Sequence, residues 1–166
     1  MKKIFKDADE KLNYSISKLI LNGPEDQLQL TQNTQPSILT VSFSIFKVLK
    51  EEFNFDFNTF NYFAGHSLGE YSALACSDAL KFEDTLKLLK IRGQSMQDAV
   101  PNNTGGMMAI LGSSIEKIES ILKNNIDTYR CYIANDNSSN QIVVSGFNED
   151  LNKLAADLKQ LQIKNI

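Results

Sequence analysis

Histidine is almost absent from this sequence: His66 is the only one among 166 residues. A single imidazole leaves no histidine cluster that could hold a metal ion, and it offers only one candidate for a histidine base. The two cysteines, Cys76 and Cys131, lack the C-x-x-C spacing of redox and zinc motifs. We therefore expect two small buried thiols in a reducing cytoplasm, and no metal or redox cofactor.

A strong charge imbalance and long apolar runs are also missing. The formal net charge is -3, with 22% charged and 42% hydrophobic residues, and this gives no reason to expect nucleic acid as a partner. Charges between Lys6 and Glu10 interrupt any signal-peptide core, and no segment approaches the ~18 apolar residues of a membrane span. We expect a soluble cytoplasmic protein without membrane contact.

The first hundred residues predict mostly helices, with one strand among them. Apolar residues at three- and four-residue steps predict a first helix, and "NGP" at Asn22–Pro24 ends it. Pro36 fits the first turn of a second helix, which is apolar almost all round and is therefore expected to lie between other elements. The predicted elements are helices over 9–21 and 36–53, a strand over 58–65, and helices over 68–80 and 83–100.

The stretch "PNNTGG" at Pro101–Gly106 is the clearest break in the sequence. Beyond it the pattern follows the order strand-helix-strand-strand-helix-strand, which is the order of a ferredoxin-like unit. We therefore predict an α/β portion over residues 1–103 and a ferredoxin-like α+β subdomain over residues 104–166, with a boundary near Asn103–Gly105. The predicted elements are strands over 106–112, 129–136 and 140–146, helices over 113–125 (with serine capping) and 148–161, and an extended segment over 162–166.

The stretch Gly65-His66-Ser67-Leu68-Gly69 has the G-x-S-x-G form, with an apolar run before it and a helical segment after it. This arrangement is typical of a nucleophile elbow, in which a sharp strand-to-helix turn exposes the serine hydroxyl. The helix that follows aims the Leu68 backbone N–H and the positive end of its dipole at the site. Ser67 is therefore the candidate nucleophile, and Leu68 is the candidate oxyanion donor.

The base that would deprotonate Ser67 is not evident. Successive side chains at a tight turn point in different directions, so we expect His66 to be packed beneath the turn and bonded to backbone. The base is then either not a histidine or not part of this sequence.

Longer motifs give a more specific likeness. The stretch "GHSLGEYSAL" at Gly65–Leu74 resembles the serine motif of the malonyl-CoA:acyl carrier protein transacylase family. The resemblance implies an α/β-hydrolase-like core, present in part over residues 1–103, that carries the ferredoxin-like subdomain. The other motifs that resemble the family are "TQPSIL" (Thr34–Leu39), "IRGQSMQDAVP" (Ile91–Pro101), "GGMMAILG" (Gly105–Gly112) and "NDNSSNQIVVSG" (Asn135–Gly146).

The resemblance implies transfer of a malonyl group from malonyl-CoA to the phosphopantetheine thiol of acyl carrier protein, in fatty acid biosynthesis. Ser67 would carry the malonyl ester, the Leu68 N–H would bind the oxyanion, and Arg92 would pair with the free carboxylate. The residues themselves support Arg92, because a guanidinium binds a carboxylate bidentately and this lysine-rich chain has only one other arginine. The remaining implied substrate-binding residues are Met96, which would line the acyl pocket, and the polar residues Gln35 and Asn137.

The sequence also departs from the family pattern. Neither the G-Q-G-S-Q-like loop, whose glutamine is the second oxyanion donor, nor the S-x-H motif with the catalytic histidine can be found. We therefore expect an interior fragment or truncated product that is nearly inactive by itself. Two alternatives stay open, a polyketide-synthase-type acyltransferase and a non-catalytic remnant that binds acyl carrier protein. An unrelated esterase is less favoured because it needs neither Arg92 nor the second subdomain.

Overall fold

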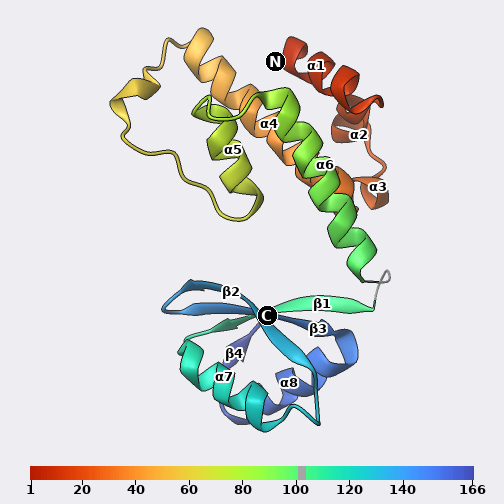
Figure 1. Cartoon of the computed structure of the whole chain (residues 1–166), viewed down its shortest axis with the longest axis vertical. Helices are drawn as coiled ribbons and strands as arrows, with labels where there is room; N and C mark the ends of the chain where they lie inside the picture. Colours follow the sequence, from red (N-terminus) through yellow and green to blue (C-terminus); the bar gives the residue numbers. More distant parts are fainter. Residues whose placement is uncertain (101–103) are drawn as a thin grey trace. The chain divides into compact units, whose positions relative to one another are not determined.

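A computed structural model describes residues 1–100 and 104–166, which form two compact units, Met1–Ala99 and Val100–Ile166 (Figure 1). The predicted boundary near Asn103–Gly105 and the start of the "PNNTGG" break fall on or beside residues 101–103, which lie outside the described residues.

All the regular secondary structure of the first unit is helical, and α4 is its central element. Helix α4 contacts α1, α2, α3, α5 and α6 because most of its circumference is apolar, as the sequence predicts. The buried core is made by Ala8, Ile16, Leu39, Phe43, Phe46, Ala75, Phe82, Leu86 and Leu89. The elements are α1 (Lys2–Leu12), α2 (Ile16–Asn22), α3 (Glu25–Gln29), α4 (Thr31–Glu51), the 3-10 helix η1 (Phe57–Thr59), α5 (Leu68–Cys76) and α6 (Phe82–Ala99).

The helix predicted over 9–21 is wrong in its extent, because the chain forms two helices there. Asn13 ends α1 in the left-handed conformation, with φ 58°, which asparagine tolerates better than most residues. The Asp9 carboxylate then accepts hydrogen bonds from the Ser17 backbone N–H at 2.8 Å and from the Ser15 hydroxyl at 3.3 Å. A side chain of α1 therefore satisfies one of the free backbone donors at the start of α2.

Pro36 lies inside α4 rather than in its first turn, because the helix begins five residues earlier, at Thr31. The backbone N–H groups of Asn33 and Thr34 both donate to the Leu30 carbonyl, at 2.7 and 2.9 Å. These bonds complete a helical turn before the proline, which removes only one donor of the ladder.

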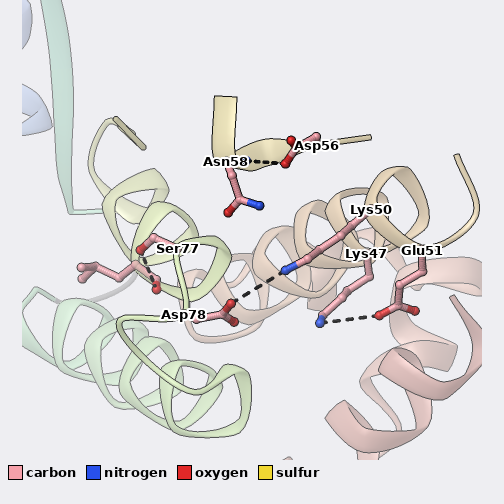
Figure 2. A network of polar contacts seen from close by, with 8 residues as sticks. Lys47, Lys50, Glu51, Asp56, Asn58, Ser77 and Asp78 are labelled. Atoms are coloured by element: carbon pink, nitrogen blue, oxygen red, sulfur yellow. Dashed lines mark hydrogen bonds and ion pairs between the residues drawn. The ribbon is translucent and has the colours of Figure 1, made fainter. Parts of the chain in front are cut away.

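The strand predicted over 58–65 is not present. A strand needs a neighbour for its N–H and C=O groups, and the described residues of the first unit contain no other strand. Aromatic contacts hold the segment instead: Phe57 lies 4.4 Å from Phe46 and 4.8 Å from Phe55, between ring centroids. At the same end of the unit, Asp56 caps η1 by accepting from the Asn58 N–H at 2.9 Å (Figure 2).

Two ion pairs involve the end of α4, and one of them joins it to the segment after α5. Lys50 lies 3.9 Å from Asp78, just beyond α5, and Lys47 lies 3.6 Å from Glu51 within α4 (Figure 2). Lys47 is half-buried but the other three side chains are exposed, so each pair contributes only about 0–1 kcal/mol.

The second unit is a four-stranded antiparallel sheet in the order β2-β3-β1-β4, with helices α7 and α8 packed on one face (Figure 1). The observed order of elements is the predicted strand-helix-strand-strand-helix-strand, and Ser114 caps α7 by accepting from the Lys117 N–H. Its core is formed by Met108, Ile110, Ile118, Leu122, Tyr129, Cys131, Ile142, Val144, Leu151, Leu154, Leu158 and Ile163. The elements are β1 (Gly105–Leu111), α7 (Ile115–Asn124), β2 (Cys131–Ser138), β3 (Gln141–Phe147), α8 (Asn148–Gln160) and β4 (Lys164–Asn165).

Among the described helices of both units, none combines the length and the apolar character needed to cross a bilayer.

Candidate active site

Ser67 is held in a strained conformation at the start of α5. Its φ of 54° and ψ of -115° lie outside the regions that non-glycine residues ordinarily occupy, and such strain is typical of functional positions. The turn closes so tightly that a Cβ on Gly65 would lie 2.0 Å from the Gly69 carbonyl oxygen. Gly65 therefore permits the close approach of the chain before Ser67 to the first turn of α5.

The backbone donors that follow Ser67 begin helix α5. The Gly69 and Glu70 N–H groups donate to the carbonyls of His66 and Ser67, at 2.8 and 3.2 Å. Leu68 is the first residue of the helix, so its N–H has no acceptor within α5. An oxyanion at this position would meet a free N–H and the positive end of the helix dipole.

Arg92 on α6 reaches the Ser67 hydroxyl. Its Nη2 donates to Ser67 Oγ at 3.0 Å, and its Nη1 donates to Oε1 of Gln35 on α4. Helices α4 and α6 can approach this closely because Gly93 has no side chain: a Cβ there would lie 2.6 Å from the Gln32 Cα. Three helices therefore bring the nucleophile, a cation and an amide together.

Gln35 connects the cation to Met96. The Gln35 side chain is only 4% exposed, and its Nε2 donates to Met96 Sδ at 3.3 Å. Met96 lies one helical turn beyond Arg92, on the same face of α6, and is 48% exposed. The structure thus groups four of the residues that the sequence singles out, Ser67, Arg92, Gln35 and Met96.

The sequence did not single out Tyr71, whose ring lies 5.8 Å from Arg92 Cζ. The sequence signal for Tyr71 is its position four residues after Ser67, because this spacing places the two residues on the same face of a helix.

An open, apolar hollow of about 530 Å³ lies beside the turn. It is bordered by the turn itself at Ala64–Gly65, by Leu68, and by the side chains of Ile38, Phe46 and Phe63. Phe63 and Ile38 are 38% and 44% exposed, so apolar surface reaches the solvent directly beside the serine.

His66 is exposed, so the expectation that it packs beneath the turn is wrong. The chain before it forms no paired strand among the described residues, and the turn consequently lies at the surface of this unit. Asn137 lies on β2 in the second unit, where its amide donates to Gln141 Oε1 at 2.9 Å. Asn137 thus belongs to the second unit, whereas Ser67, Arg92, Gln35 and Met96 all belong to the first.

Burial disfavours the reactive thiolate form of both cysteines. Cys131 is buried, as expected, and Cys76 is half-buried at the end of α5. Burial, and to a smaller extent the nearby Asp78 carboxylate, raises the pKa of Cys76 to about 11. Burial likewise raises the pKa of Cys131. Within the described parts of the chain, no group of three histidine, cysteine or acidic residues is placed to hold a metal ion.

A serine on a strained turn before a helix, with a helix N-terminal N–H and a guanidinium beside it, is an arrangement typical of acyl-transferring sites. The family model described as "Acyl transferase domain" matches residues 2–165, so the chain belongs to this family.

Individual relatives show which kind of acyltransferase the chain resembles. The chain is 39% identical over 160 residues to the malonyl CoA-acyl carrier protein transacylase of Haemophilus influenzae, covering 96% of this chain and 51% of that protein. It is 40% identical over 146 residues to the protein of the same name from Bacillus subtilis, covering 87% and 45% of the two chains. The chain thus spans about half the length of the curated relatives it matches.

Solved structures agree in fold. The acyl-carrier-protein-S-malonyltransferase of Bartonella henselae superposes with a TM-score of 0.87 at 36% identity, over 98% of this chain and 52% of that one. A malonyl-transacylase in complex with a type II PKS acyl-carrier protein superposes with a TM-score of 0.86 at 34% identity, over 98% and 52%.

Proposed function

We propose that this chain supplies the nucleophile and the carboxylate-recognising part of a malonyl-CoA:acyl carrier protein transacylase of fatty acid biosynthesis. The observation that carries the proposal is the contact of Arg92 Nη2 with Ser67 Oγ at 3.0 Å. An acyl group bound to Ser67 would place a carboxylate at its far end within reach of the same guanidinium. Arginine is suited to this role because it stays charged and can donate two parallel hydrogen bonds.

In the proposed reaction, Ser67 Oγ attacks the thioester carbonyl of malonyl-CoA, and the carbon–sulfur bond breaks to release coenzyme A. The Leu68 N–H stabilises the oxyanion of the tetrahedral intermediate. The thiol of phosphopantetheine on acyl carrier protein then attacks the malonyl ester and regenerates the Ser67 hydroxyl. Coenzyme A enters as part of the substrate, and the proposal includes no separate cofactor.

The proton of the Ser67 hydroxyl must pass to a base during acylation. Arg92 cannot accept it, because a guanidinium remains protonated in proteins. The hydrogen-bond partner that the structure gives Ser67 is therefore a recognition group, and the base is a different residue.

We also infer the finer features of the fold. The sheet order β2-β3-β1-β4 with two helices on one face supports a ferredoxin-like subdomain, and the turn at Ser67 before α5 supports an α/β-hydrolase-like core. Met96 would border the acyl pocket, and the family resemblance supports Asn137 as a further substrate-binding residue. A cytoplasmic location belongs to this proposal as well.

A second candidate function uses the same chemistry with a different carrier. The similar malonyl-transacylase bound to a type II PKS acyl-carrier protein favours it, because the acyl-recognising residues need not change with the carrier. Purified carrier proteins of the two kinds, offered to the acylated enzyme in competition, would separate these candidates.

The test is acylation of Ser67 in the 166-residue chain. Malonyl-CoA and acetyl-CoA are supplied separately, and mass spectrometry follows the peptide that contains Ser67. We expect slow malonylation that Ser67→Ala abolishes and imidazole in the buffer accelerates, because imidazole can serve as the base. His66→Gln should leave the rate unchanged, which would separate solution rescue from catalysis by His66.

Arg92→Ala should slow malonylation about ten- to a hundred-fold, since a hydrogen bond to a charged group contributes roughly 1.5–3 kcal/mol. Acetylation should not change, because an acetyl group carries no free carboxylate. Equal losses with both thioesters would contradict the role of Arg92, and malonylation at a residue other than Ser67 would contradict the proposal as a whole.

A further inference from the structure

Arg92 is a long side chain that is only half-buried, yet three groups fix its guanidinium. Gln35 accepts from Nη1, Ser67 accepts from Nη2, and the Tyr71 ring lies 5.8 Å from Cζ. In the first two contacts, a substrate would compete for the guanidinium N–H donors or would move the oxygen atoms that accept from them. The Tyr71 ring occupies no N–H donor, so it can keep its place when a carboxylate binds.

Tyr71 is itself well anchored. It lies four residues after Ser67 and so occupies the same face of α5, one turn along the helix. Its side chain is partly buried and packs against the core cluster of the first unit, which includes Leu39 and Ala75. The ring therefore presents a fixed surface next to a side chain that would otherwise sample several rotamers.

We propose that Tyr71 is a positioning residue that holds the Arg92 guanidinium beside Ser67, and that it thereby sets the preference for acyl groups that carry a free carboxylate. This inference rests on the proposed function, because it gives Arg92 the role of binding the carboxylate. Without the ring, Arg92 would have to be ordered each time a carboxylate binds. A cation–π contact of this kind corresponds to about a two- to five-fold difference in affinity.

The sequence offers a direct readout of the position of Arg92. Arg92 and Arg130 are its only arginines, so a 15N-labelled sample gives two Nε–Hε signals, and Arg130 in the second unit is the internal reference. We expect Tyr71→Leu and Tyr71→Met to shift the Arg92 signal and lower its heteronuclear NOE, leaving Arg130 unchanged. Tyr71→Phe keeps the ring and should preserve both properties.

Malonate provides the functional readout, as a small dicarboxylate probe, with acetamide as a comparison that carries no carboxylate and should not move the Arg92 signal. Titration of the wild-type chain with malonate should move the Arg92 signal. The malonate Kd should rise about two- to five-fold in Tyr71→Leu and Tyr71→Met but not in Tyr71→Phe. Tyr14→Leu is the matched control. Tyr14 packs against the same core and lies 4.9 Å from Lys90 Nζ, so its loss removes a similar contact away from Ser67. It should leave the Arg92 signal and the malonate Kd unchanged.

The outcomes separate the two proposals. An Arg92 signal and NOE that stay unchanged in both Tyr71→Leu and Tyr71→Met would overturn the positioning role, whatever malonate does. If malonate fails to move Arg92 in the wild type, the carboxylate role of Arg92 is wrong, and the specificity proposed for Tyr71 falls with it. Equal shifts of Arg92 in Tyr14→Leu and Tyr71→Leu would mean a general loss of packing and would also overturn the proposal.

Discussion

Gly65→Ala should damage the site more than any conservative change elsewhere in the turn. A methyl group at this position would lie 2.0 Å from the Gly69 carbonyl oxygen, 2.1 Å from the Gly69 carbonyl carbon and 2.7 Å from the Glu70 nitrogen. All three atoms belong to the backbone of the first turn of α5, so no flexible side-chain end can move aside. Either the turn opens or α5 shifts, and each movement takes Ser67 away from Arg92.

The magnitude follows from the cost of overpacking. Inserting a methyl group into a filled site costs about 1–3 kcal/mol, and a clash with backbone belongs at the upper end, about 2–3 kcal/mol. A unit of about 100 residues has an unfolding entropy of about 0.2 kcal/mol/K, so its midpoint should fall by about 10–15 °C. Gly69→Ala is the matched control. A Cβ at Gly69 meets nothing within 4 Å, and alanine in a helix should stabilise by about 0.5–1 kcal/mol.

The assay must separate the two compact units, because a single unfolding curve would average them. Amide NMR signals of α5 and α6 report on the first unit during heating, and those of β1 and β3 give an internal reference. We expect Gly65→Ala to lower the midpoint of the first set only, with loss of the native Arg92 Nε–Hε signal. A variant as stable as the wild type with an unmoved Arg92 signal would refute the close contact between Gly65 and α5.

Three further outcomes are expected. Gly93→Ala should force α6 away from α4, because its Cβ would lie 2.6 Å from both the Gln32 Cα and the Thr31 carbonyl oxygen. Malonate binding and the stability of the first unit should therefore both decrease. If neither decreased, the close packing of α4 and α6 at Gly93 would be contradicted. Cys76 should react with iodoacetamide at pH 8 about a hundred-fold more slowly than an ordinary thiol, because its pKa of about 11 leaves little thiolate. Alkylation of Cys76 at the rate of a free thiol would contradict its burial. The Arg130 N–H and the Lys153 ammonium hold the pKa of Asp150 below its usual value, so their contribution is present above about pH 4 and is lost as the pH falls through the lower folded value. Asp150→Asn should remove this acid dependence from the pH titration of second-unit stability, and an unchanged dependence would assign it to other carboxylates.

Elements that depend on local signals could be predicted from the sequence. Helix α6 and the order of strands and helices in the second unit follow from apolar periodicity. The capping serine Ser114 marks the start of α7. The division between α1 and α2 could not be predicted, because it depends on Asn13 adopting a positive φ and on Asp9 reaching forward to Ser17. Periodic apolar residues continue across the break and conceal it.

The segment before Ser67 shows why a strand is harder to predict than a helix. A helix satisfies its own backbone, whereas a strand depends on a neighbour that its own residues do not specify. The alternating aromatic residues around Phe57 and Phe63 suit a strand, but in the described structure they pack on Phe46 and on one another. The candidate site likewise has one part with a local sequence signal and one part without. The turn at Ser67 can be recognised from its own five residues, but the contact with Arg92 spans two helices, and only family resemblance suggested it.

The geometry also separates recognition from proton transfer. Ser67, Arg92 and Gln35 come from α5, α6 and α4, and their contacts depend on one glycine, Gly93, where two of these helices meet. None of these contacts offers Ser67 a base, because arginine only donates. Selection of the acyl group can therefore persist in the helical unit even where acylation is slow. For this reason malonate binding and Ser67 malonylation should respond differently to substitution: changes at Tyr71 should alter binding, whereas imidazole should alter only the rate.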